Sequence, residues 1–507
     1  MAPTAESLLL QVLAKDGITL TTGLTTVALF LTAYLVIDAI YSVTLHPLAS
    51  YPGPISTAIS RLPWWWSCIT GDQVKFMVKL HTKYGPVVRF SPNDLSYVDQ
   101  SGETWKDIYG YEKGKEEFVK AQEWFVTPHN GVNSLISAGY EDHRRMRRLF
   151  SPAFSDRGLR QQRPLFQKHT DRMVARIAAV AETGKPLDMV RMYNATTFDI
   201  MGELTFGQSL GKIDDEEYAE WISSIFRAVK VIPFVQIIQY YPWLNALFNY
   251  FEPQFIKKMK NNHHRMASDR VDKRIERGSD QPDIWNLVES AQEGQGLSLK
   301  EMHSNGEFLI LAGSETTATL LSGLTYNLIQ NPIVMQTLTR EIRSSFAKES
   351  DIAMDALTSL PYLDACMHEN MRLYPAVPIG VPRVVPEGGR IIDGRYVSAG
   401  LRVSVHHYST FHDPGNFKNP YSYAPERWLG DPLYKDDHRK TLQPFSVGPR
   451  NCLGQNMALN EMRLLIARVL YKFDLELCEE SQNWTDQKVY ALWEKKPLIC
   501  KVKLAAA

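Results

Sequence analysis

The sequence predicts a mainly α-helical protein with small β-sheets (α+β) that follows one N-terminal transmembrane helix. Three observations predict this class: an uncharged apolar run near the amino terminus, helical hydrophobic periodicity through most of the remaining chain, and two short stretches of Val and Ile between turn residues. With 507 residues, of which 44% are hydrophobic and 11% aromatic, the composition is that of a globular protein with a sizeable core.

The apolar run extends from Gly17 to Ile37 without a charged residue. As a helix it would be about 31 Å long at about 1.5 Å per residue, enough to cross a hydrocarbon core. Asp38 would cost about 3 kcal/mol at mid-bilayer, so the transmembrane helix should cover about 17–40 and leave Asp38 at the interface. A cleaved signal peptide is the alternative, but the run is long, lacks a basic n-region and shows no small-residue cleavage site before Asp38.

The segment that follows this run contains several prolines. Pro47, Pro52 and Pro54 cannot continue a helix, so residues 46–55 should be a stiff hinge between a membrane anchor, residues 1–45, and one large domain, residues 56–507. No later hydrophobic run reaches bilayer length. The apolar stretch from Phe234 to Phe255 fits either contact with the membrane surface or a pair of core or channel helices.

The sequence pattern of the large domain predicts helices except in two places. Between Pro375 and Val405 short alternating runs, including Gly389 to Val397, predict a small β-sheet, and Val489 to Val502 predicts a second β-rich piece. Lys15 precedes the apolar run, whereas four basic residues, Arg61, Lys75, Lys79 and Lys83, follow it, and this bias in positive charge places the domain on the cytosolic side.

Charge and cysteine content exclude some classes of protein. Lys+Arg and Asp+Glu both number 56, so no overall positive field favours nucleic acid. The 5 cysteines are an odd number and contain no C-x-x-C pair, which fits a reducing compartment and argues against zinc. The acceptor patterns at Asn194 and Asn483 would then be chance matches, since a cytosolic domain is not N-glycosylated.

Only Cys452 has neighbours that suggest chemistry. It lies in a loop, Phe445 to Gly454, before a helical pattern that extends from Met457 to Phe473. Unpaired N–H groups at a helix N-terminus favour thiolate, the form that binds iron. In the same loop Gly448 and Gly454 would let the backbone approach a flat macrocycle, and Arg450 could neutralise a carboxylate of that ligand.

This loop resembles the haem loop of the cytochrome P-450 superfamily, with matches at Phe445, Gly448, Arg450, Cys452 and Gly454. The resemblance implies the cytochrome P-450 fold, in which haem b lies between a long distal helix and the proximal Cys loop. Cys452 would be the axial ligand of the haem iron. Thiolate ligation pushes electron density toward bound oxygen and favours O–O cleavage.

A long helical pattern begins near Ser298, with a Ser298…Glu301 capping box, and ends before Pro332. It contains Ala312-Gly313-Ser314-Glu315-Thr316-Thr317, in which a mid-helix glycine costs about 1 kcal/mol that close passage over a cofactor would explain. Thr316 can bond back to the Ala312 carbonyl and open the helix to water and oxygen. The resemblance identifies this as the distal helix, with Thr316 and Glu315 catalytic; a structural ion pair is the alternative for Glu315.

Two further motifs support the same assignment. Glu369 and Arg372 are three residues apart on a helix between Pro361 and Pro375, and the resemblance implies that they form a structural network with Arg427. His143 and Arg147 are one helical turn apart, and together with Arg383 they should bind the haem propionates. The flanking Arg144, Arg145 and Arg148 would face outward, either solvated or as a reductase-docking patch.

The resemblance is nearest to the fungal microsomal type that includes trichothecene hydroxylases and benzoate hydroxylases. It implies an oxygen-dependent monooxygenase of the endoplasmic reticulum membrane, single-pass and facing the cytosol, that hydroxylates or epoxidises a small lipophilic substrate. Such enzymes serve fungal secondary-metabolite biosynthesis, which includes terpenoids, polyketides and alkaloids. The substrate would lie against Ala312 and 376–381, with 104–132, 226–248 and 492–497 completing the pocket.

No dinucleotide-binding motif is present, so electrons should come from a separate NADPH-cytochrome P-450 reductase, with cytochrome b5 as a second candidate donor. Two other functions remain open at this point. One is a haem-thiolate isomerase or dehydratase that needs no external electrons, and the other is a haem-binding sensor without turnover.

Overall fold

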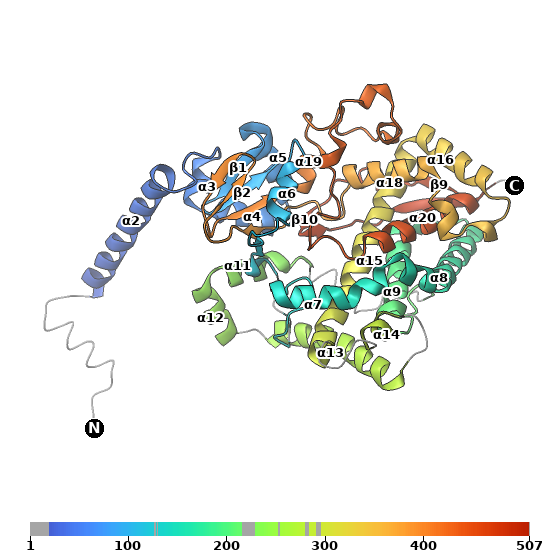
Figure 1. Cartoon of the computed structure of the whole chain (residues 1–507), viewed down its shortest axis with the longest axis horizontal. Coiled ribbons are helices and arrows are strands. Elements are labelled where there is room, and N and C mark those ends of the chain that lie inside the picture. Colours follow the sequence, from blue (N-terminus) through green and yellow to red (C-terminus); the bar gives the residue numbers. More distant parts are fainter. Residues whose placement is uncertain are drawn as a thin grey trace.

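The computed structural model describes residues 20–125, 128, 130–214, 229–251, 254–278, 283–289 and 296–505. Helices dominate and the strands form small sheets, which confirms the expected fold class (Figure 1). The blue helix α2 (Leu20–Thr44) projects from the body at the left of the view, and the helices and sheets of the later chain pack together beside it.

Helix α2 is the candidate membrane span. Thr21–Thr44 has a mean hydropathy of 1.9, and none of its most apolar window is buried against the rest of the protein. The expected span of about 17–40 falls partly on residues 17–19, which lie outside the described residues. At the other end the helix continues to Thr44, so Asp38 lies within its last two turns.

The body contains the following helices: α3 (Ile55–Ile59), α4 (Leu62–Ile69), α5 (Gln73–Tyr84), α6 (Glu103–Tyr109), α7 (Tyr140–Phe150), α8 (Asp156–Thr183), α9 (Met189–Phe206), α11 (Ile232–Tyr240), α12 (Pro242–Tyr250), α13 (Gln254–Arg277), α14 (Ile284–Glu289), α15 (Leu299–Gln330), α16 (Pro332–Ser345), α17 (Met354–Leu357), α18 (Pro361–Leu373), α19 (His407–Phe411) and α20 (Gln455–Lys472).

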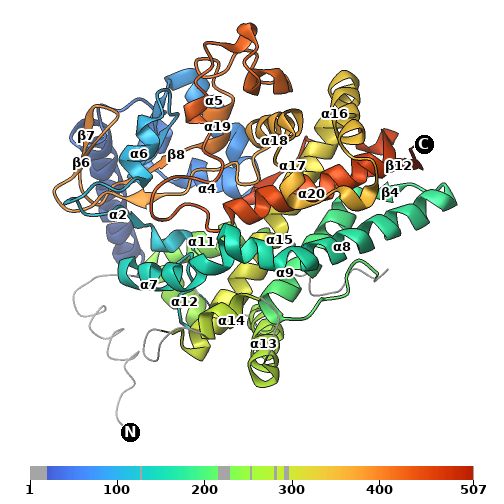
Figure 2. The same cartoon turned by 45° about the vertical axis from the view of Figure 1, so that its right-hand side comes forward.

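Helix α15 runs through the middle of the body, where α9, α13, α18 and α20 surround it (Figure 2). Its start confirms the sequence prediction, because Ser298 accepts a hydrogen bond from the Glu301 N–H and Glu301 reciprocates at the Ser298 N–H. Its middle is buried on nearly all sides, so periodicity there is weak and length and capping define the helix.

The strands form one larger sheet and three small ones. In the larger sheet the order is β1-β2-β8-β5-β3, built from β1 (Val87–Ser91), β2 (Asp94–Tyr97), β8 (Arg402–Val405), β5 (Arg383–Val384) and β3 (Val119–Lys120). The small sheets are β4 (Leu187–Asp188), β12 (Ile499–Leu504) and β9 (Phe473–Leu477); β6 (Arg390–Ile392) and β7 (Arg395–Val397); and β10 (Val489–Tyr490) and β11 (Leu492–Trp493). Both β-rich regions expected from the sequence are confirmed.

Three hydrophobic clusters hold these helices and sheets together, and the smallest of them joins α4, α5 and β1. The largest cluster joins α8, α9, α15, α18 and α20, and the second lies between the larger sheet and α6. The loop that carries Cys452 enters α20, so one end of that loop is attached to the largest cluster.

Candidate functional site

The Cys452 loop has a tightly turned backbone. Ser446 and Gly448 both have positive φ, 59° and 76°, and the Cys452 N–H donates to the Phe445 carbonyl at 2.9 Å. Helix α20 begins three residues after Cys452, with Gly454 as its N-cap. The sequence expectation of a cysteine just before a helix N-terminus is therefore confirmed in geometry.

Cys452 is the exposed cysteine of the five, while Cys68, Cys366, Cys478 and Cys500 are buried. Surrounding protein still desolvates its sulfur and raises the pKa of the thiol, and the Gly454 N–H and the charge of Arg147 act in the opposite direction. A sulfur that is accessible, yet enclosed by protein and near an arginine, can take the thiolate form once a metal cation binds it.

The glycines of this region have reasons that the sequence did not reveal. A Cβ on Gly448 would lie 2.0 Å from the Tyr109 carbonyl oxygen, so close packing on the end of α6 requires glycine there. A Cβ on Gly454 would meet nothing nearer than Phe154 at 3.9 Å. On α15, a Cβ on Gly313 would lie 2.6 Å from the Met201 sulfur of α9. Packing between protein segments therefore supplies a reason of its own for glycine at 448 and at 313.

Thr316 has the local geometry expected of it. Its hydroxyl donates to the Ala312 carbonyl four residues earlier, at 2.7 Å, and the side chain is half-buried. A hydroxyl bonded to the preceding turn competes with the helical N–H for that carbonyl and can loosen the helix locally. Ala312, Gly313 and Thr316 are half-buried, whereas Ser314 and Glu315 are buried, and α15 continues through this turn.

Glu315 forms a buried ion pair, which is the alternative that the sequence left open beside a catalytic role. The Lys495 Nζ lies 2.7 Å from Glu315 Oε1, and the two side chains are 3% and 2% exposed. Lys495 also donates to the Thr319 hydroxyl at 2.9 Å, whereas Glu315 Oε2 has no hydrogen-bond partner within the described part of the chain. Burial raises the pKa of Glu315 and lowers the pKa of Lys495. The structure therefore favours the ion-pair alternative for Glu315.

Cationic side chains gather near the Cys452 loop. Arg147 of α7 donates to the Asn451 carbonyl at 2.7 Å, and Arg450 donates to the Ala138 carbonyl at 2.9 Å. Arg383 of β5 is 4% exposed, and its Nη1 has no hydrogen-bond partner among the residues that the structure describes. His143 lies among them, and burial together with the neighbouring positive charges lowers its pKa to about 3.

The sequence did not reveal one member of this group, Lys120. It lies directly opposite Arg383 in the antiparallel pair of β3 and β5, is 8% exposed, and donates to the Ile136 carbonyl. Burial, followed by repulsion from Arg383 and Arg450, lowers its pKa well below the ordinary range. A lysine in a two-residue strand has no sequence signature, so only the strand pairing identifies it.

The net charge of these cationic side chains indicates whether they could hold haem. Like charges directly opposite in a sheet are destabilising, and burial strengthens their repulsion. The carboxylate among them is Glu117, which pairs with Arg450 at 3.1 Å. The excess positive charge and the unpartnered Arg383 Nη1 suit a ligand with two carboxylates, and a nearby accessible cysteine suits a metal. The residues present therefore fit haem, because its two propionates would pair with the cations and its iron would bind the cysteine.

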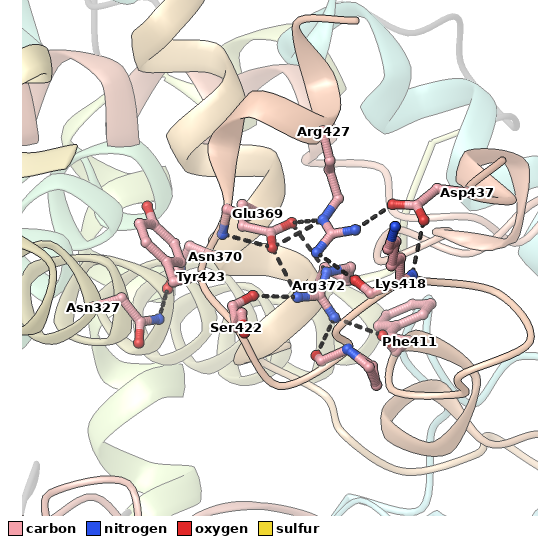
Figure 3. A network of polar contacts seen from close by, with 12 residues as sticks. Asn327, Glu369, Asn370, Arg372, Phe411, Lys418, Ser422, Tyr423, Arg427 and Asp437 are labelled. Atoms are coloured by element: carbon pink, nitrogen blue, oxygen red, sulfur yellow. Dashed lines mark hydrogen bonds and ion pairs between the residues drawn. The ribbon is translucent and has the colours of Figure 1, made fainter. Parts of the chain in front are cut away.

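The predicted structural trio is assembled in the interior (Figure 3). Glu369 receives hydrogen bonds from Arg372 at 2.8 and 3.0 Å and from Arg427 at 3.0 Å, and all three side chains are 0% exposed. Asp437 pairs with Arg427, and the Trp428 indole N–H donates to Glu369 at 2.9 Å. Arg372 further donates to carbonyl oxygens of Phe411, Pro420 and Ser422, so the network fixes the segment that precedes the Cys452 loop.

The flanking arginines of α7 do not all face solvent. Arg144 is exposed, but Arg145 pairs with Glu301 and donates to the Gly296 carbonyl at 3.1 Å, which ties α7 to the start of α15. Asn194, one of the two acceptor patterns, is 2% exposed within α9 and is unavailable for glycosylation.

The expected pocket walls are only partly described. Residues 126, 127, 129 and 226–228 lie outside the described residues. The segment 492–497 borders a cavity of about 450 Å³ together with Asn194, Val229 and Lys230. Lys495 lines this cavity and also forms the ion pair with Glu315.

Comparison with known proteins agrees with this geometry. A sequence model of the cytochrome P450 family matches residues 58–502. Cytochrome P450 monooxygenase FUM2 of Gibberella moniliformis is 42% identical over 466 residues, 91% of this chain and 98% of that protein. Cytochrome P450 monooxygenase efuB of Hormonema carpetanum is 40% identical over 95% of this chain and 96% of its own length. Averantin hydroxylase of Dothistroma septosporum is 42% identical over 90% of this chain and 87% of its own length.

These relatives are named monooxygenases and a hydroxylase, and all three come from fungi. The family carries haem iron, uses O2 with electrons from a redox partner, and acts on lipophilic substrates. The matched region includes the Cys452 loop, α15 and the buried Glu369 network. The chain belongs to the cytochrome P450 family, as a haem-thiolate monooxygenase.

Proposed function

We propose that this monooxygenase holds haem b and hydroxylates or epoxidises a small lipophilic substrate in fungal secondary-metabolite biosynthesis. The observation that carries the proposal is an accessible Cys452 beside a buried group of cations, in a chain of this family. The names of the relatives support the reaction class: two are cytochrome P450 monooxygenases and one is a hydroxylase of averantin. A terpenoid, a polyketide or an alkaloid is the proposed class of substrate.

Each site residue has a proposed role. Cys452 is the axial ligand of the iron, and Phe445, Gly448 and Gly454 shape its loop. Arg147, Arg383, Arg450 and His143 bind the propionates, and Lys120 joins them. Ala312 and Gly313 form the distal wall, and the trio Glu369, Arg372 and Arg427 maintains the fold around the Cys loop.

Thiolate-ligated haem, when bound, supplies dioxygen reduction and O–O cleavage. The chain's own contribution is to position and protonate. The Thr316 hydroxyl, which bonds to the Ala312 carbonyl, can turn from that acceptor to donate a hydrogen bond toward the reacting oxygen. Glu315 precedes Thr316 on α15 and pairs with Lys495 of the carboxyl-terminal segment, whose positive charge favours the ionised carboxylate.

We further propose that residues 1–45 anchor the protein in the endoplasmic reticulum membrane as a single pass, that 46–55 connect the anchor, and that 56–507 form the catalytic domain in the cytosol. Helix α2 supports the anchor. In that compartment NADPH-cytochrome P-450 reductase would be the electron donor, with cytochrome b5 as a second one.

The experiment that tests the function follows NADPH consumption by the full-length protein in the presence of that reductase and a panel of terpenoid, polyketide and alkaloid substrates. The proposal expects NADPH and O2 to be consumed together and one oxygen atom of labelled O2 to appear in the product. Product formation without reductant would instead identify an isomerase or dehydratase. Tight haem binding with no product from the panel would favour a sensor.

A further inference from the structure

Aromatic side chains that are distant in sequence form a continuous series of ring contacts beside the carboxyl end of α18. The Tyr374 ring stacks on the Trp493 ring with centroids 4.7 Å apart, and Trp493 lies edge-on to Tyr408 at 6.2 Å. Tyr408 stacks on His412 at 3.9 Å, and His412 lies 5.1 Å from Tyr421. Centroids about 4.5 to 7 Å apart or closer belong to rings in contact, so this ring series has no gap between 374 and 421.

The inner end of the ring series lies behind the segment 376–381, which is expected to face the substrate. The Trp493 indole N–H donates to the Pro375 carbonyl at 2.8 Å. The Tyr408 backbone N–H donates to the Pro378 carbonyl at 3.0 Å. These two bonds hold an indole and a phenol directly against the wall of the expected substrate pocket.

Exposure to solvent increases at the other end of the ring series. Tyr374 is 2% exposed, Trp493 8% and His412 3%, and Tyr408 is half-buried, whereas Tyr421 is 63% exposed. A phenol that gives up an electron also gives up its proton, and an exposed phenol can pass that proton to water. Tyr421 is therefore the member of the ring series at which a radical can reach solvent.

The members of the ring series differ in their chemistry. Indole and phenol rings give up an electron more easily than imidazole does, so His412 serves as a bridge between Tyr408 and Tyr421. The His412 Nδ1 donates to the Tyr408 carbonyl at 2.9 Å, and burial, followed by the charge of Arg372, lowers the pKa of His412 to about 3. The imidazole is therefore neutral and does not repel an electron-deficient ring beside it.

A side branch leaves the ring series at Tyr374. The Trp484 ring lies 5.3 Å from Tyr374 and 5.6 Å from Tyr326, whose hydroxyl donates to the Gln482 carbonyl at 2.8 Å. Trp484 is buried and Tyr326 is half-buried. This branch ends at a phenol whose proton is held by a carbonyl group of the protein, so Tyr421 is the more favourable exit.

We propose that the ring series protects the protein by carrying oxidising equivalents from the haem site to Tyr421 when O–O cleavage is not followed by oxidation of a substrate. In each transfer Tyr421 loses one electron and its phenol proton, the electron passes inward through the rings to the haem site, and the proton goes to water. Two such transfers, with two protons taken up from water, convert the unused oxygen atom into water. A small soluble thiol then gives each Tyr421 radical one hydrogen atom, and two thiyl radicals combine into one disulfide. The inference rests on haem being bound at Cys452 and is independent of the class of substrate.

The test treats the full-length, haem-loaded protein with cumene hydroperoxide in the absence of substrate, reductase and thiol. A nitroso spin trap, 2-methyl-2-nitrosopropane, captures radicals, and peptide mass spectrometry locates the adducts. Tyr396, which is 61% exposed on β7, is the matched control phenol. The carbon monoxide spectrum of each variant shows that haem is still bound to a thiolate, so a failure of haem binding is distinguished from a failure of the ring series.

The proposal expects most of the adduct at Tyr421 and little at Tyr396, and added glutathione should abolish it. Tyr408→Phe keeps the ring packing but removes the oxidisable phenol, so it should lose most of the Tyr421 adduct and gain oxidation of Trp493 and faster bleaching of the haem. Tyr396→Phe should change none of these. No adduct at Tyr421, equal adducts at Tyr396 and Tyr421, or adducts mainly at Tyr326 would overturn the proposed route. An undiminished Tyr421 adduct in Tyr408→Phe would overturn transfer through the ring series.

Discussion

Lys495→Met is the substitution whose effect follows most directly from the structure. Methionine keeps the length of the side chain but removes the charge that faces Glu315 at 2.7 Å. Because both side chains are almost fully buried, no solvent can replace the lost partner. The variant therefore leaves a carboxylate alone in the interior of the protein beside α15.

The magnitude follows from this burial. Removing one partner of a buried ion pair typically costs about 3 to 5 kcal/mol of unfolding free energy, and protonation of Glu315 limits that loss. Burial already raises the pKa of Glu315, and loss of Lys495 raises it further. The folded state then binds a proton more tightly than the unfolded state, so stability falls as pH rises from the ordinary range of a carboxyl toward the raised value. Each pH unit in that window contributes at most about 1.4 kcal/mol.

The assay is urea unfolding of haem-loaded protein, followed by circular dichroism at several pH values. Lys495→Met should lose most stability at alkaline pH and approach the parent protein at acidic pH. Glu315→Gln combined with Lys495→Met should recover much of the loss, because the amide needs no counter-charge. Lys496→Met, at the exposed neighbouring position, is the matched control and should have little effect. A loss that does not depend on pH, or that persists in the double variant, would refute the reasoning.

Four further variants test other parts of the site. Thr316→Ala should divert reduced oxygen to hydrogen peroxide, which a peroxide assay during NADPH consumption detects; unchanged coupling would reject the role of the hydroxyl. Lys120→Met should speed haem transfer to apomyoglobin if Lys120 binds a propionate, while Lys115→Met, at an exposed site of the same segment, should not. Glu369→Gln should cost about 3 to 5 kcal/mol and reduce the yield of haem-loaded protein, measured as haem per chain, and full loading would contradict the structural role. Gly448→Ala should do the same, because its Cβ would lie 2.0 Å from a carbonyl oxygen; normal loading would show that the loop can shift.

Local chemistry explains what could be predicted from the sequence. The Ser298 capping box and the back-bond from Thr316 to Ala312 involve residues three or four apart, where helix geometry alone determines the contact. Helix α18 ends before Pro375 because proline and the residue before it disfavour the helix. The motif at Cys452 likewise determines its own loop and the following helix. Such local features can be predicted from the residue types alone.

Contacts between distant segments could not be predicted in the same way. Lys495 meets Glu315 across 180 positions because the carboxyl-terminal hairpin returns to α15, and Lys120 meets Arg383 only through the pairing of two very short strands. The reasons for Gly313 and Gly448 lie with Met201 and Tyr109, which belong to other helices. A glycine shows that space is short, but it does not show which neighbour fills the space.

The most direct test of the central claim is the absorption spectrum of the purified protein after reduction under carbon monoxide. Ligation of haem iron by the Cys452 thiolate predicts a Soret band shifted far to the red, and Cys452→His should abolish that shift while haem remains bound. A parent protein that binds haem without the shift, or a Cys452→His variant that keeps it, would contradict the assignment of Cys452 as the iron ligand.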